Sequence, residues 1–246
     1  MISESETQTA AVKPVKRGPS SGKAPASDDN ISHNLYGQRL GRKGRDTRDR
    51  IIAAANALLA RPEPTPMTLS AVAREASLGM TTLYLYFTDL TELLLAVLEP
   101  VMATAEEAYL QAIRDRWPDE TLGEHCQVFL LSYHAFWLRH TRVLHLRNAM
   151  ADQHDVRMLA HRVASATTLI GLVVEQMDAS PDDAGSAPYD MATVLMSGIE
   201  RVVTMATNMD VQNLISGGRG AENARDRLRA AARLLELGIR DHRPVR

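Results

Sequence analysis

Residues 67–87 read MTLSAVAREASLGMTTLYLYF and predict two short helices separated by a tight turn. Thr68 is suited to cap the first helix, because a threonine hydroxyl can accept a hydrogen bond from a backbone N–H early in the helix. Residues 77–80 interrupt the helical pattern, and a second helix follows in which Leu83 and Phe87 lie four apart and can pack on the first. The apolar residues of the first helix recur at helical spacing: Leu69, Val72, Ala73 and Ala76.

The second helix has a predicted outward face of polar and aromatic residues. The major groove of DNA admits one α-helix, and each base pair presents a distinct pattern of donors and acceptors there. Threonine hydroxyls can donate and accept, and tyrosine hydroxyls can contact phosphate oxygens. An ordinary helical hairpin is the alternative interpretation. The residues of this face are Met80, Thr81, Thr82, Tyr84 and Tyr86.

The string TLYLYF at residues 82–87, followed directly by TDLTELLLAVL, resembles the TetR family of bacterial transcriptional regulators. In that family the recognition helix ends with a Leu-Tyr pair, an aromatic-rich segment and a Phe. A long helix follows directly. The resemblance is strong over about residues 45–100, and beyond them it rests on helix count and length. Ser77 stands where the family has Gly, and Gly79 where it often has Ser or Thr. Leu90 replaces a lysine that contacts a DNA phosphate in many relatives.

The resemblance implies an all-α fold of about nine helices: an N-terminal three-helix DNA-binding domain and a larger helical domain for ligand binding and dimerisation. We expect a disordered tail over residues 1–36, a basic arm with the DNA-binding domain over 37–88, and the larger domain over 89–246. The tail segment VKRGPSSGK resembles a minor-groove-binding arm, and a merely solvated tail is the alternative. By family position, DNA contacts are also expected at Thr68 and Ser70.

Basic residues gather in front of and within the predicted DNA-binding helices. Residues 37–88 carry eight basic and four acidic side chains, whereas residues 89–246 carry 16 basic and 22 acidic ones. This distribution suits counterion release at DNA phosphates. Arg42, Lys43 and Arg45, on a Gly-spaced and flexible arm, are candidates for a narrow minor groove, with plain solubility as the alternative. Arg48, near the start of a first helix over about residues 47–60, is placed to contact a phosphate.

The composition limits the kinds of protein to which this chain can belong. The 246-residue chain is 45% hydrophobic and only 4% aromatic, which favours helices over sheets. Cys126 is the single cysteine, so an intramolecular disulfide is excluded and a reducing compartment is expected. The first ten residues lack the features of a secretory signal, and the densest apolar run, residues 93–98, is too short to span a membrane. We therefore expect a cytoplasmic protein.

The larger domain is predicted to begin with a long helix from about Asp89 to Arg116, which Pro100 should kink. The kink either belongs to signal transmission or only improves packing. Further helices are expected over residues 121–139, 142–151, 154–178, 189–209 and 222–239, and the helix over 189–209 should be heavily buried because it is apolar nearly all round.

The family resemblance also implies a small-molecule pocket and a homodimer. An apolar or amphipathic effector is expected, because no cluster of charge for a phosphate is evident in the sequence. Two-fold symmetry would present two recognition helices to a palindromic operator. The candidate pocket residues are Tyr109, Phe129, Tyr133, Phe136, Trp137, Met150, Met158 and Met177. The candidate dimer residues are Ala206, Leu228, Ala231, Ala232 and Leu235.

Two other classes remain as alternatives: a helical metal-dependent enzyme and a protein-binding module. Residues 124–126, Glu-His-Cys, and several histidines suggest metal ligands, but no pair has the spacing of a zinc site. No Gly-rich phosphate loop or G-x-S-x-G motif is found. We therefore expect a DNA-binding regulator, most simply a repressor, with no catalytic or metal site and no cofactor.

Overall fold

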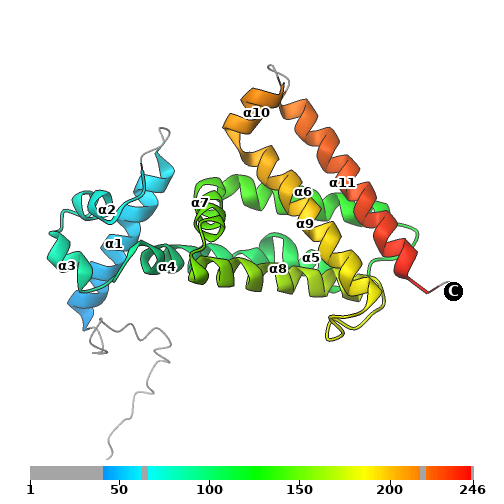
Figure 1. Cartoon of the computed structure of the whole chain (residues 1–246), viewed down its shortest axis with the longest axis horizontal. Helices are drawn as coiled ribbons and strands as arrows, with labels where there is room; N and C mark the ends of the chain where they lie inside the picture. The colour runs from blue at the N-terminus through cyan, green and yellow to red at the C-terminus, as the bar shows by residue number, and fades with distance from the viewer. Residues whose placement is uncertain (1–40, 62–65, 217–219, 245–246) are drawn as a thin grey trace, which may run out of the picture.

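The computed structural model describes residues 41–61, 66–216 and 220–244. In these residues the chain forms eleven α-helices and one π-helical turn, with no β-strand, which confirms the all-α prediction. The first three helices form one end of an elongated molecule, and α4 leads from them into a larger bundle (Figure 1). The predicted disordered tail, residues 1–36, lies outside the described residues.

The N-terminal end consists of α1 (Arg42–Ala60), α2 (Leu69–Glu75) and α3 (Met80–Tyr84). The apolar stripe of α1 is buried against α2, and α2 in turn packs on α3. These short helices are stabilised by burial of their apolar faces, because isolated helices of such length are not stable in water. The buried apolar residues of this end are Ile51, Ala54, Ala55, Leu58, Val72, Ala73, Ala76, Leu83 and Phe87.

The predicted continuous helix up to Arg116 is wrong, because the helix is interrupted after α4 (Leu90–Ala103). A turn at Thr104, whose hydroxyl donates to the Val101 carbonyl at 2.7 Å, leads into the π-helix Glu106–Leu110 and then into α5 (Gln111–Arg114). Pro100 itself stays inside α4, and the irregular stretch begins four residues later. Proline lacks the N–H that would bond the carbonyl one turn earlier, so the last turn of α4 is weakened.

The larger bundle contains six helices, of which α6, α9 and α11 pack on one another and α8 lies between α7 and α9. Helix α6 buries seven residues, from Leu122 to Trp137, which lie on its inward side. The helices are α6 (Leu122–Arg139), α7 (Thr141–Asp152), α8 (Val156–Gln176), α9 (Ala187–Thr207), α10 (Met209–Ser216) and α11 (Gly220–His242).

Two expectations about the end of the chain are corrected. The helix over 189–209 is not buried all round, since Val194 on α9 is 69% exposed. A separate helix, α10, follows, and the sequence analysis did not predict it. Asn208 ends α9 in an extended conformation, and its side-chain oxygen accepts a hydrogen bond from the Val211 N–H at 3.0 Å, so it also caps α10.

Helix α8 is long and apolar enough to cross a membrane by length and composition alone. In the fold it packs along α7 and α9 (Figure 1), and it carries Arg157 and Arg162, both of which form ion pairs with other elements. This environment fits a helix of a folded bundle, because such charged side chains are costly within a bilayer.

Candidate nucleic-acid interface and ligand cavity

The turn between α2 and α3 is built by a residue with a left-handed backbone. Thr68 caps α2 as predicted, with its hydroxyl accepting from the Ala71 N–H at 3.1 Å. Ser77 has φ 53°, which is the conformation that glycine adopts most easily. Gly79 has φ −74° and an extended ψ, so it does not supply the left-handed residue of the turn. Ser77 takes this role, and its side chain is exposed.

Helix α3 presents only part of its predicted outward face to solvent. Thr81 is exposed and Tyr84 is 45% exposed. Met80 and Tyr86 are partly buried and pack against the core, and Thr82 is half-buried. Thr81 and Tyr84 are therefore the side chains of α3 best placed to reach another molecule.

At the start of α2 the candidate residues have different roles. Ser70 is exposed, and its hydroxyl lies 3.1 Å from the Thr68 hydroxyl. Since Thr68 already accepts the capping hydrogen bond, Ser70 has the freer hydroxyl of the pair. Arg74, in the last turn of α2, is exposed and adds a positive charge near α3 that the sequence analysis did not single out.

The expected flexible arm is wrong for Arg42, Lys43 and Arg45, because all three lie in the first turn of α1. The Gly41 carbonyl accepts hydrogen bonds from the N–H groups of residues 44 and 45, at 2.9 and 3.0 Å, which starts the helix. Arginine and lysine favour helices, and one interior glycine costs only about 1 kcal/mol relative to alanine, so the Gly spacing did not prevent helix formation. Arg42 and Lys43 are exposed on this turn.

Arg48 connects the start of α1 with the end of α3. Its guanidinium carbon lies 5.3 Å from the centre of the Phe87 ring, which is a cation–π contact. In Figure 1 the first turns of α1 lie beside α3. The basic turns of α1 and the exposed hydroxyls of α3 therefore belong to the same end of the molecule.

Polar contacts fix this end to the bundle. The Asp89 carboxylate caps α4 by accepting from the Glu92 N–H at 2.9 Å and pairs with Arg157 of α8 at 2.8 Å. Thr91 donates to Asp155 at 2.5 Å, and this hydrogen bond lowers the pKa of Asp155. The Arg142 guanidinium donates to two carbonyls at the end of α1. Movement of α4, α7 or α8 would therefore displace the N-terminal helices.

A small cavity lies inside the bundle, between the end of α4, the π-helical turn and helices α6 to α9. Its volume is about 50 Å³. Tyr109, Tyr133, Phe136 and Trp137 line it, as predicted for a pocket. Phe129, Met150, Met158 and Met177 do not line this cavity, and three of them, all but Met150, are buried in the core. Burial raises the pKa of Tyr109 to about 12, so its hydroxyl stays neutral and can donate a hydrogen bond.

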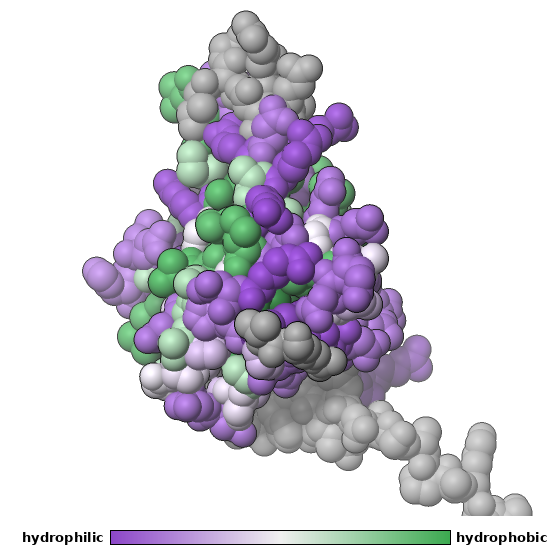
Figure 2. All heavy atoms as spheres, turned by 90° about the vertical axis from the view of Figure 1, so that its right-hand side faces the viewer, coloured by the Kyte–Doolittle hydropathy of each residue, from purple (hydrophilic) through white to green (hydrophobic). Residues whose placement is uncertain are grey.

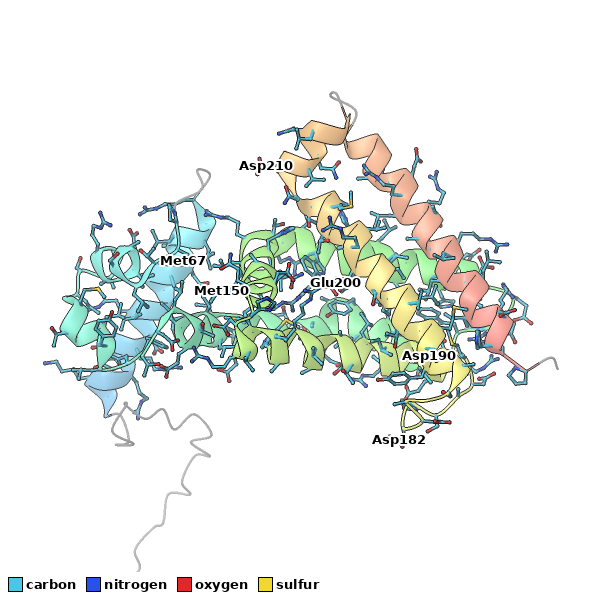
Figure 3. All side chains as sticks on the ribbon, in the orientation of Figure 1. Met67, Met150, Asp182, Asp190, Glu200 and Asp210 are labelled. Atoms are coloured by element: carbon cyan, nitrogen blue, oxygen red, sulfur yellow. The ribbon has the colours of Figure 1, made fainter. Side chains whose placement is uncertain are left out.

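The cavity wall contains charges that the sequence analysis missed. Arg147 of α7 has a side chain only 5% exposed, and burial lowers the pKa of its guanidinium. Its carbon Cζ lies 5.6 Å from the centre of the Trp137 ring. Glu200 of α9 lies on the side of that helix that faces α7 (Figure 3), where it accepts from Asn148 at 3.1 Å. The Arg162 Nε lies 3.4 Å from the same Glu200 oxygen.

A sequence signal for Arg147 exists. Arg147 lies on the same face of α7 as Val143, Leu144 and Ala151, all of which are buried. An arginine in the inward stripe of a helix indicates a buried partner or a ligand, because a lone buried charge is costly. The sequence analysis found no cluster of charge for a phosphate, whereas the structure brings Arg147, Arg162 and Glu200 together at the cavity.

The candidate dimer residues have mostly inward-facing side chains. Leu228, Ala231, Ala232 and Leu235 of α11 are each at most 8% exposed within one protomer, where α11 packs on α6 and α9, and Ala206 is half-buried. A second copy would instead meet the outward residues of these helices. The exposed apolar residues there are Val194 on α9 and Leu234 and Leu237 on α11.

Figure 2 views the face that carries α11 and shows apolar side chains gathered in its middle, with hydrophilic ones around them. A wider hollow of about 590 Å³ lies between α6, α10 and α11. Leu131 and Leu138, which border this hollow, are 48% and 57% exposed. This part of the bundle therefore has apolar surface that another chain can cover.

The histidines of the bundle are partly buried single groups. Burial lowers the pKa of His134, His140, His145 and His161. Among the described residues, no group of three or more His, Cys, Asp or Glu side chains is arranged to hold a metal ion. Cys126 is buried, and burial raises the pKa of its thiol to about 12, so the reactive thiolate is disfavoured.

Comparison with known proteins gives no match: no family model fits the chain, and no curated protein is detectably similar to it. The likeness to TetR regulators therefore rests on the residues themselves.

Proposed function

We propose that this chain is a homodimeric DNA-binding transcriptional regulator of the TetR type, most simply a repressor that a small molecule releases from its operator. The observation that carries the proposal is the pair of short helices α2 and α3, joined by a tight turn, with Thr81 and Tyr84 exposed on the second. Hydroxyls on a short exposed helix suit contacts to base edges and phosphates in the major groove.

The charges at this end support DNA as the partner. Arg42, Lys43 and Arg74 are exposed, and Arg48 lies against Phe87 beside α3. Arg42 and Lys43 lie on a helix and not on a flexible arm. We therefore assign them to phosphates at the edge of the major groove rather than to the minor groove. Such contacts position the protein but do not read sequence.

Helix α4 is the proposed link between ligand and DNA. It begins at the Asp89 cap, three residues after Tyr86, and its Met102 lines the cavity. At about 1.5 Å per residue, the thirteen residues between these points span roughly 20 Å. A ligand that prefers one position of α4 would shift the N-terminal helices of both subunits and so change the spacing between them.

The second copy in this proposal covers the outward faces of α9 and α11, where Val194, Leu234 and Leu237 are exposed. A two-fold interface is self-complementary, so the same apolar residues would meet on both subunits. Two copies of α3 would then contact successive major grooves on one face of the duplex.

The test uses Thr81→Ala and Tyr84→Ala in the full chain, with binding to DNA from upstream of its own coding region compared with shuffled DNA. Loss of a base contact costs about 1–3 kcal/mol, so each change should lower the preference for the upstream DNA by about tenfold or more. Val163→Ala, at an exposed position of α8 outside the proposed DNA and dimer faces, is the matched control and should leave the preference unchanged. An unchanged preference in both α3 variants would show that α3 does not read DNA.

A further inference from the structure

The cavity has an inner and an outer chamber that share a charged boundary. The inner chamber, of about 50 Å³, is lined by aromatic and aliphatic side chains. The outer chamber, of about 290 Å³, is lined mainly by polar groups of α7 and α9, including Asn148 and Thr204. Arg162, Ser197 and Glu200 line both chambers, so a molecule that entered from the outer chamber would pass these side chains first.

The two guanidinium groups at the boundary are not equally well paired. Two guanidinium groups, Arg147 and Arg162, share the single carboxylate of Glu200. Arg162 has a second partner in Asp152, at 3.0 Å on the outer side. In the described residues Arg147 pairs with no second carboxylate, and its side chain is more deeply buried than that of Arg162. One buried positive charge is therefore incompletely neutralised.

The hydrogen bonds of Arg147 are also incomplete. In the described part of the chain its only hydrogen bond runs from Nε to the side-chain oxygen of Asn148, at 3.0 Å. Its terminal nitrogen Nη2 lies 3.9 Å from Glu200, which is too long for a hydrogen bond. A guanidinium has five N–H groups, so the two terminal nitrogens offer donors towards the cavity that it lines.

The walls beside Arg147 suit an apolar group. Trp137 lies under the guanidinium, and Phe136 and Tyr109 have ring centres 5.1 Å apart. Met102 and Met196, from opposite sides, complete the inner chamber. Methionine side chains are flexible and adapt to ligands of different shape, so a chamber of this size can widen around a ring or a short chain.

We propose that this cavity binds a small organic monocarboxylate, with its carboxylate on Arg147 and its apolar part against Trp137 and Phe136. A carboxylate accepts two parallel hydrogen bonds from the terminal nitrogens of one guanidinium. One carboxylate matches the one guanidinium at the boundary that has no carboxylate within hydrogen-bond distance. As the identity of the effector, this assignment rests on the proposed regulatory function, and it narrows the expected apolar or amphipathic effector to an amphipathic carboxylate.

The experiment compares carboxylates with their uncharged amides on the full-length protein. The probes are benzoate against benzamide and butyrate against butyramide, with binding measured by calorimetry and by the fluorescence of Trp137 and Trp117. We expect at least one carboxylate to bind about tenfold or more tightly than its amide, because the amide cannot neutralise Arg147. No preference for the carboxylate in either pair would overturn the proposal.

Two variants test the assigned residues in opposite directions. Arg147→Met should weaken carboxylate binding by about tenfold or more, and it leaves Glu200 with Arg162 and Asn148 as partners. Glu200→Gln removes the competing carboxylate and should tighten binding several-fold. Arg139→Met, on an exposed turn of α6, is the matched control and should change nothing. Weaker binding in Glu200→Gln would contradict the charge argument even if Arg147→Met failed to fold.

DNA binding without any probe separates this inference from the function on which it rests. If upstream DNA binds specifically but no carboxylate is preferred over its amide, the result supports the regulatory function and contradicts the proposed ligand class. If a carboxylate binds through Arg147 but upstream DNA is not preferred, the result supports the cavity assignment and contradicts the regulatory function.

Discussion

The N-terminal three helices and the larger bundle bury different kinds of side chain. Among the described residues up to Phe87, every buried side chain is apolar. In the bundle, polar and charged groups are buried as well: Thr91, Arg147, Gln176, Thr204, Thr207, Gln212 and Arg243. The buried interior of the first region is apolar, whereas that of the second also contains hydrogen bonds between distant parts of the chain.

The difference fits the tasks that we propose for the two regions. A core of apolar side chains leaves the outward face of α3 free to vary without loss of fold, since no buried polar group depends on it. The bundle holds buried polar groups in fixed positions, and these supply specificity at a cost in desolvation. Arg147 faces the cavity with unused donors, whereas Gln176 has all of its side-chain groups bonded.

The largest expected effect concerns Gln176 at the end of α8. Its side-chain oxygen accepts from the Trp117 N–H at 2.9 Å, and its nitrogen donates to the Ile113 and Asp115 carbonyls, each at 2.9 Å. Gln176→Leu would leave these buried backbone groups without partners, at about 1–3 kcal/mol each, so we expect a loss of roughly 3 kcal/mol or more in the free energy of unfolding.

Urea denaturation measures this loss, and Glu175→Gln, on the exposed neighbour, is the control that should change stability by less than about 0.5 kcal/mol. A loss below about 1 kcal/mol in Gln176→Leu would break the comparison, because the bundle would then be stabilised by packing alone.

A smaller effect, of opposite sign, is expected in the N-terminal region. Ser77 has φ 53°, a conformation that costs a non-glycine residue about 1–2 kcal/mol. Ser77→Gly removes that cost but adds chain entropy to the unfolded state, so we expect a gain of about 0.5–1 kcal/mol. Thermal unfolding should show a higher Tm for Ser77→Gly and no gain for Ser77→Ala, because alanine keeps the Cβ atom. A lower Tm for Ser77→Gly would show that the serine stabilises the turn.

The sequence predicted the parts of the fold that follow local rules. The helix cap at Thr68 and the buried face of α2 at Val72, Ala73 and Ala76 depend on neighbouring residues, and both are confirmed. Ser77, which stands where the resembled family has Gly, has a left-handed backbone. Such features can be predicted because they depend on contacts between residues that are close together in the sequence.

The remaining features arise from contacts between distant residues. The cluster of Arg147, Arg162 and Glu200 joins three helices, so no local pattern places them together. Helix α1 begins at Arg42, although the Gly spacing there predicted a flexible arm. The break after α4 lies beyond Pro100 rather than at Pro100. Here several weak preferences compete, and tertiary packing decides the outcome.

The most direct test of the account is a salt titration of DNA binding by the unmodified protein, with upstream DNA and shuffled DNA side by side. The account predicts tighter binding to the upstream DNA and a steep fall in affinity, with a log–log slope of about −4 or steeper, since each neutralised phosphate contributes about −0.9 and two subunits bind together. Equal binding to both DNAs with a flat salt response would contradict it, and the paired helices α2 and α3 would then be only a structural hairpin.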